Sequence, residues 1–214
     1  MDEKFSEVMN SRAAVYKLLG RLFRKEADEE LMGQLRVLDF SEVPSAKVKD
    51  GFKKMKSVVA DSSNLLDDLA VDYARVFLGA GIAEGLVAFP FESVYTSKDR
   101  LVMQDAYEQV LRIYRSNCVE KIDADLYEDH IGLELEFMGH LCAQAAQLAA
   151  EGKETELSAN FDLQQSFLVK HLLNWTPDFL KDIQGVPATD FYKGVALVTE
   201  GFLEMEKEFF LNDN

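Results

Sequence analysis

Apolar residues recur at three- and four-residue steps along most of the chain, which is the spacing of one face of an α-helix. The first stripe runs from Phe5 to Phe23, and the last runs from Tyr192 to Phe209. Between these stripes the same spacing predicts helices over residues 29–38, 46–59, 64–78, 97–115, 125–150 and 157–175. No segment shows the strict alternation of a half-buried strand. The pattern predicts an all-α fold, a single globular domain over residues 1–214 with about eight to ten helices.

The helical spacing is interrupted within one long segment, residues 71–97. This segment opens as the end of the 64–78 helix, for which Asn64 is the expected N-cap. Glycine ends helices or permits tight turns, and three glycines follow, at Gly79, Gly81 and Gly85. Pro90 removes a backbone donor and favours an extended residue before it. The sequence predicts a loop of about twenty residues that carries aromatic side chains, and loops of that length are usually functional when they are too apolar to be disordered.

The charge balance of the chain limits the classes of partner that it is expected to bind. A formal net charge of -15 disfavours binding to nucleic acid or to an anionic membrane surface and favours a cationic partner, although acidity also serves solubility. The two cysteines lie in separate helical segments, so a disulfide framework is not expected. The first twenty residues lack the pattern of a signal peptide, and no window is apolar enough for a membrane span. We expect a cytoplasmic protein.

Acidic residues are concentrated between Ile122 and Val169. Ten acids and a single base, Lys153, lie in this segment, whereas the first sixty residues are far more basic. Such an asymmetry predicts an acidic face, and the alternative is an ordinary solvated helix surface.

Candidate catalytic chemistry is confined to one cluster, His130, Glu134, Glu136 and His140. His130 and Glu134 share one helix face, as do Glu136 and His140, because each pair is four residues apart. A di-iron carboxylate bundle needs Glu-x-x-His on two helices, and this spacing is longer by one residue and has no second copy. No phosphate-binding glycine loop or nucleophile motif is present. We therefore expect no enzyme, no cofactor and no metal, and keep a helical metal-carboxylate enzyme as the alternative.

Several blocks of sequence together resemble the TorD/DmsD family. They are the segments Asp72-Tyr73-Ala74-Arg75-Val76-Phe77-Leu78-Gly79, Pro90-Phe91-Glu92-Ser93-Val94-Tyr95, residues 129–138, residues 167–175 with His171 and Trp175, and Phe191-Tyr192. The likeness covers roughly residues 5–210, and the order and spacing of the blocks make it specific. Members of this family are cytoplasmic chaperones of molybdoenzymes, also called redox enzyme maturation proteins. The tryptophans of one family branch are replaced here by aromatic residues at Tyr73, Phe91 and Tyr95, so the branch and the client enzyme stay open.

The resemblance implies an all-helical chaperone that binds the twin-arginine signal peptide of a molybdopterin-dependent oxidoreductase and assists cofactor insertion before export. Such a peptide presents two guanidinium groups and then an apolar stretch, so its site needs carboxylates and an apolar groove. We expect Asp129 and Glu92 to bind the arginines, with His130 adding a pH-sensitive donor. The side chains expected in the groove are Tyr73, Phe77, Pro90, Phe91 and Tyr95.

Alternative interpretations of these residues stay open. Tyr73 and Phe77 lie on the apolar face of their own helix and could belong to the core, and Asp129 could be a helix-start residue. His171 and Trp175 fit packing better than ligand contact. The expected partners are the leader and the catalytic subunit of the client, and the protein is a monomer or a homodimer.

Overall fold

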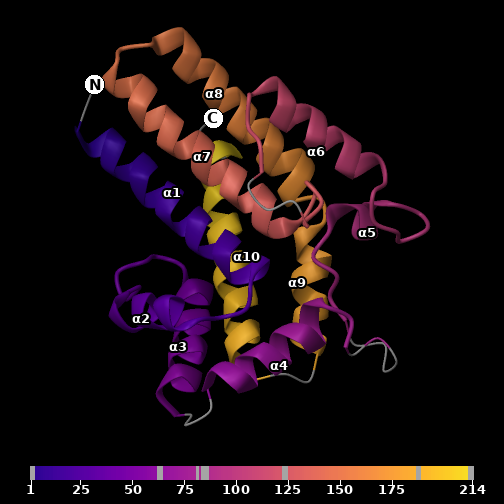
Figure 1. Ribbon diagram of the computed structural model, residues 1–214. Coiled ribbons are helices and arrows are strands. Elements are labelled where there is room, and N and C mark those ends of the chain that lie inside the picture. The colour runs from indigo at the N-terminus through magenta and orange to yellow at the C-terminus, as the bar shows by residue number, and fades with distance from the viewer. Residues whose placement is uncertain are drawn as a thin grey trace. The chain divides into compact units, whose positions relative to one another are not determined.

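The computed structural model describes residues 3–61, 65–80, 82, 87–121, 125–186 and 189–211. These residues form an all-α fold, which confirms the predicted fold class (Figure 1). Pairing of extended backbone within them is limited to one isolated antiparallel bridge between Phe91 and His130. The helices are α1 (Glu3–Arg24), α2 (Glu29–Val37), α3 (Ala46–Asp61), α4 (Leu65–Phe77), α5 (Glu92–Thr96), α6 (Asp105–Ser116), α7 (Ile131–Ala150), α8 (Glu154–Phe167), the π-helix η2 (Leu168–Leu172), α9 (Thr176–Gly185) and α10 (Asp190–Leu211).

The chain divides into two compact units, and each is built from two separate stretches of sequence. Unit 1 contains residues 1–24 and 91–175, and unit 2 contains residues 25–90 and 176–214. The prediction of one domain over residues 1–214 stays a prediction. No helix among the described residues is both long enough and apolar enough to cross a membrane.

Unit 1 is organised around α7, which packs along α1 and against α8 (Figure 1). Small residues allow α1 and α7 to approach closely. A Cβ atom added to Gly20 would lie 2.8 Å from the carbonyl oxygen of Gly132, and one added to Gly132 would lie 2.9 Å from that of Gly20. The helix α7 is buried on most of its circumference, so that polar side chains on it are forced into the interior of the unit.

Unit 2 is organised around α3 and α10, which also meet through glycines. A Cβ atom on Gly51 would lie 2.6 Å from the carbonyl oxygen of Gly194, a distance that the helix pair could not accommodate without shifting. An aromatic cluster joins α4 to α9 and α10. The ring centroid of Phe77 on α4 lies 5.3 Å from that of Tyr192 on α10 and 6.2 Å from that of Phe179 on α9.

The end of α4 confirms the expected role of Gly79. Its φ is +82°, and the Ala80 N–H donates to the carbonyl of Ala74 at 3.2 Å, so the chain turns back over the last turn of α4 through a left-handed glycine. Asn64, Gly81 and Gly85, which were also expected to shape this region, lie outside the described residues.

Two predicted helix boundaries are wrong. Ser97 ends α5 rather than starting a helix, and α6 begins only at Asp105. The helix expected from Asp125 begins at Ile131, because the preceding residues form the turn that pairs with Phe91. The second error has a long-range cause, the bridge between Phe91 and His130, whereas the Ser97 N–H keeps a local bond to the Ser93 carbonyl at the end of α5. The aromatic part of the predicted loop contains the short helix α5.

Candidate functional site

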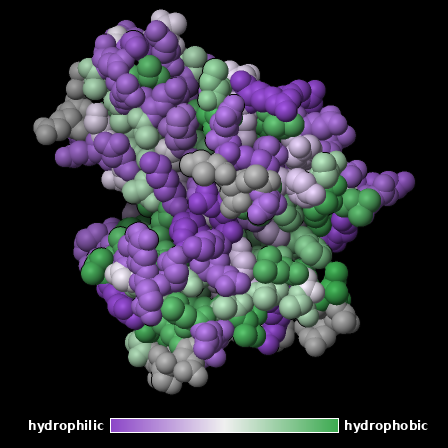
Figure 2. Space-filling model, viewed as in Figure 1, coloured by the Kyte–Doolittle hydropathy of each residue, from purple (hydrophilic) through white to green (hydrophobic). Residues whose placement is uncertain are grey.

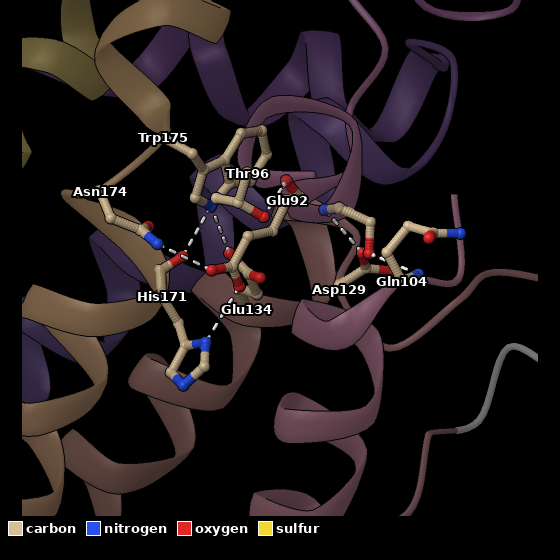
Figure 3. A network of polar contacts seen from close by, with 9 residues as sticks. Glu92, Thr96, Gln104, Asp129, Glu134, His171, Asn174 and Trp175 are labelled. Atoms are coloured by element: carbon tan, nitrogen blue, oxygen red, sulfur yellow. Dashed lines mark hydrogen bonds and ion pairs between the residues drawn. The ribbon is translucent and has the colours of Figure 1, made fainter. Parts of the chain in front are cut away.

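The short helix α5 is held at its start by the turn that precedes α7 (Figure 3). The first N–H groups of a helix have no partner within it and need outside acceptors. Phe91, at the N-cap, offers no side-chain acceptor. Asp129 supplies both: its carbonyl accepts from the Glu92 N–H at 2.9 Å, and its Oδ2 accepts from the Ser93 N–H at 2.9 Å. Asp129 therefore caps a helix far from it in sequence.

Glu92 is directed into unit 1, where both of its carboxylate oxygens are engaged (Figure 3). Oε2 lies 3.0 Å from Nδ1 of His171, and Oε1 accepts from the Asn174 amide at 2.9 Å. The residue is 2% exposed. Through these bonds the N-terminus of α5 is tied to η2 and to the residues directly after it.

Glu134 is a second fully buried carboxyl group, in the first turn of α7. Its Oε2 accepts from the indole Nε1 of Trp175 at 3.2 Å, and this N–H is shared with the carbonyl of His171 at 2.6 Å. Its Oε1 has no hydrogen-bond partner among the described residues. Burial raises the pKa of Glu134 well above its ordinary value, and the neighbouring charge of Glu92 raises it further.

Asp129 is fully buried and only partly satisfied. Its Oδ1 has no hydrogen-bond partner among the described residues. Burial raises the pKa of Asp129, while the hydrogen bonds from Ser93 act in the opposite direction. The N-cap of α7 is His130, whose Nδ1 accepts from the Gly132 N–H at 3.0 Å. The side chain of Asp129 bonds to the start of α5 instead of to the start of α7.

Aromatic side chains surround this polar cluster. The ring of Phe91 meets His130 edge-on at 5.1 Å, and Tyr95 lies 5.4 Å from the buried ring of Trp175. Phe91 and Tyr95 are half-buried, so each keeps part of its ring accessible. The guanidinium of Arg100 lies over the Tyr95 ring at 5.6 Å.

The predicted site residues are thus divided between the two units. Phe91, Glu92, Tyr95, Asp129 and His130 are brought together in unit 1. The remaining three, Tyr73, Phe77 and Pro90, are buried residues of unit 2. For Tyr73 and Phe77, burial agrees with the alternative given by the sequence, in which the two residues belong to the core. His171 and Trp175 are buried, as the packing interpretation of those two residues expects.

The cluster considered for a metal-carboxylate enzyme does not assemble. Glu134 is bonded to Trp175, whereas Glu136 pairs with Arg24 at 2.7 Å and His140 is exposed. Among the described residues no group of three histidines, cysteines or acids is placed to hold a metal ion. The predicted acidic face is also reduced, because Glu128, Asp129 and Glu134 are buried.

Sequence reasoning missed the partners of the cluster, Ser93, Glu134 and Asn174. Glu134 did carry a signal: it lies on α7 among apolar residues such as Ile131, Leu135 and Met138, where a carboxyl group requires a buried partner. Ser93 contributes both its side chain and its backbone N–H to Asp129, and no sequence pattern reveals the backbone contact.

Comparisons with known proteins decide the family. The family model described as "Nitrate reductase delta subunit" matches residues 42–181, well over half of the chain. The chain belongs to this family. It is also 26% identical to "Chaperone protein TorD" of Vibrio cholerae serotype O1 (strain ATCC 39315 / El Tor Inaba N16961), over 97% of this chain and 95% of the relative. The protein of the same name from Aliivibrio fischeri is 27% identical, over 92% and 94%.

These matches confirm the TorD/DmsD resemblance that the sequence blocks predicted. Both of these relatives are named as chaperones.

Proposed function

We propose that this protein is a cytoplasmic chaperone for a molybdopterin-dependent oxidoreductase. It binds the twin-arginine signal peptide of that enzyme and assists cofactor insertion and assembly before export. The proposal is supported by the similarity to chaperones named TorD and by the blocks of the TorD/DmsD family. The observation that carries the proposed site is the Oδ1 atom of Asp129, a buried carboxylate oxygen with no partner among the described residues.

Arginine is the side chain that suits such an oxygen. A guanidinium group donates several hydrogen bonds in a fixed plane and keeps its positive charge when it is buried. Bound at Asp129, it would satisfy Oδ1 and offset the charge that Asp129 and Glu92 place close together. Glu92 is the second acceptor in this proposal. His130, next to Asp129 and against the ring of Phe91, orients the approaching group.

The apolar part of the leader needs an adaptable apolar surface. Phe91 and Tyr95 are the first candidates for this surface. Both are only half-buried, and they flank Glu92 in the sequence. Tyr73, Phe77 and Pro90 take part only if the interior of unit 2 loosens, because all three are buried there.

Access to Asp129 and Glu92 requires α5 to move, because both side chains are almost fully covered. The helix α5 has only five residues, and isolated turns of that length are unstable without tertiary contacts. Its start depends on the bonds from Glu92 and Ser93 to Asp129. An arginine that competes for Asp129 therefore acts on the contacts that hold α5 in place.

The test is isothermal titration calorimetry with a synthetic twin-arginine leader. We expect saturable binding that weakens as salt is added, since salt screens the attraction between the cationic leader and a chain of net charge -15 over a Debye length of ~8 Å at physiological ionic strength. A leader with both arginines replaced by glutamine is the matched control. Equal binding of the two leaders would refute recognition of the arginine pair.

A further inference from the structure

The interior of unit 1 holds three carboxyl groups close together, those of Glu92, Asp129 and Glu134. Figure 3 shows the carboxyl groups of Glu92 and Glu134 directed towards one another. They lie within hydrogen-bonding reach, and both are acceptors when they are ionised. Two buried acceptors in contact are unfavourable unless one of them carries a proton.

The hydrogen-bond partners indicate which of the two groups carries it. Glu92 is contacted by His171 and Asn174 on its two oxygens, and Asn174 can only donate to it. Glu134 accepts one shared N–H from Trp175, and its Oε1 has no donor among the described residues. A carboxyl group with one weak donor and a carboxylate neighbour is the better place for the proton.

Among the described residues, Glu134 interacts with Trp175, Glu92 and Asp129, and none of these carries a positive charge. Two basic groups of unit 1 pair with other acids: Arg24 of α1 pairs with Glu136, and Lys121 pairs with Glu128. The titratable groups that interact with Glu134 are Glu92 on α5, Asp129 before α7 and Tyr114 on α6. Tyr114 also interacts with Glu128 and Glu136, and His171 on η2 contacts Glu92.

We propose that Glu134 carries a proton that it shares with Glu92, and that this proton is released when an arginine of the leader reaches the carboxyl cluster. This inference rests on the proposed function, to which it adds a coupling between leader binding and pH. Glu134 acts as a positioning residue, because its proton holds Glu92 and its Oε2 holds Trp175.

The release step follows from electrostatics. A guanidinium group stays charged, and its approach favours the ionised form of every nearby carboxyl group. The proton leaves Glu134 for the solvent, and the cluster then holds three carboxylates, those of Glu92, Asp129 and Glu134, beside the bound cation. If one proton is released, linkage requires leader affinity to rise about tenfold per pH unit wherever Glu134 is protonated in the free protein.

The experiment measures the number of protons released. Titrations of the full chain with the synthetic leader, repeated at one pH in buffers of different ionisation enthalpy, give this number directly. We expect about one proton per leader for the wild type. Glu134→Gln has no proton to release at this position, so it should bring the count to about zero at a pH where His130 does not titrate and remove the contribution of Glu134 to the pH profile of binding.

Glu136→Gln is the matched control, since Glu136 lies on the same helix two residues further on and pairs with Arg24. It should release the same number of protons as the wild type. Leader binding without proton release in the wild type would overturn the inference and leave the proposed function standing. Proton release that persists in Glu134→Gln and is lost in His171→Gln would assign the proton to His171 and overturn the inference as well.

An infrared measurement on the free protein decides where the proton lies without any leader. The wild type should show the carbonyl band of a neutral, buried carboxyl group at neutral pH, and Glu134→Gln should lack it. If this band is present and no leader binds, the proposed function and the release step both fail while the proton assignment holds. Absence of the band in the wild type would overturn the assignment itself.

Discussion

Replacing Asp129 by asparagine separates the two roles that the structure allows for this residue. The amide oxygen of asparagine can still accept the Ser93 N–H, which now bonds to Oδ2 at 2.9 Å. Asparagine caps helices about as well as aspartate, so the start of α5 should persist. The charge that could bind a guanidinium group disappears.

The magnitudes separate the two outcomes. A charge-assisted hydrogen bond contributes about 1.5–3 kcal/mol, so leader affinity should fall roughly tenfold to hundredfold in Asp129→Asn. Stability should change by less than about 1 kcal/mol, because the new amide N–H₂ replaces an unpartnered oxygen and removes a charge close to Glu92. Asp129→Ala is the control that removes the acceptor altogether and should destabilise the fold by about 0.5–2 kcal/mol.

The pH dependence gives a second check on Asp129. Its pKa is raised above 3.8 in the folded protein, so the folded state holds this proton more tightly than the unfolded chain does. The stability associated with Asp129 is complete below pH 3.8 and is lost as the pH rises through the folded pKa. Asp129→Asn should therefore gain in melting temperature relative to the wild type as the pH rises from that value. Titrations in which the variant binds the leader as tightly as the wild type would remove Asp129 from the site.

Three further substitutions test packing and recognition separately. Trp175→Ala should destabilise the fold by roughly 3–5 kcal/mol in chemical denaturation, since the ring is 1% exposed, and an unchanged unfolding midpoint would contradict this. His130→Gln should weaken leader binding mildly, and binding to the wild type should change between about pH 5.5 and 7.5 if the imidazole takes part; a flat profile would exclude it. Gly194→Ala should destabilise unit 2 by about 1–3 kcal/mol, because its Cβ would lie 2.5 Å from the Gly51 carbonyl oxygen. The control Gly33→Ala meets nothing within 4 Å and should be neutral or stabilising; equal effects in thermal melts would refute the close helix contact.

Local sequence determined the positions of several helices and the end of one of them, α4. The spacing of apolar residues predicts α2, α3 and α4 to within a residue or two, because the stripe that faces the core is visible in the sequence. Gly79 ends α4 as expected, since its left-handed φ and the bond from Ala80 are properties of a few consecutive residues. The blocks of residues that resemble the TorD/DmsD family were likewise readable without coordinates.

Tertiary structure decided where the acids and aromatics of those blocks lie. Asp125 has a good local reason to start a helix, but the bridge between Phe91 and His130 holds the residues before α7 in a turn. Ser97 could also start a helix by local rules, and in the folded chain it ends the short helix α5. Asp129 and Glu92 are polar residues that a sequence places on the surface, and the fold buries both.

Glu134 shows the reason most directly. Its spacing from His130 suggested a shared helix face and a metal site, whereas its observed partner is Trp175, 41 residues further along the chain. Helical periodicity reports which residues share a face, and it carries no information on which distant side chain that face will meet. The partners of a buried carboxyl group depend on how α5, α7 and η2 pack, and only the folded chain brings them together.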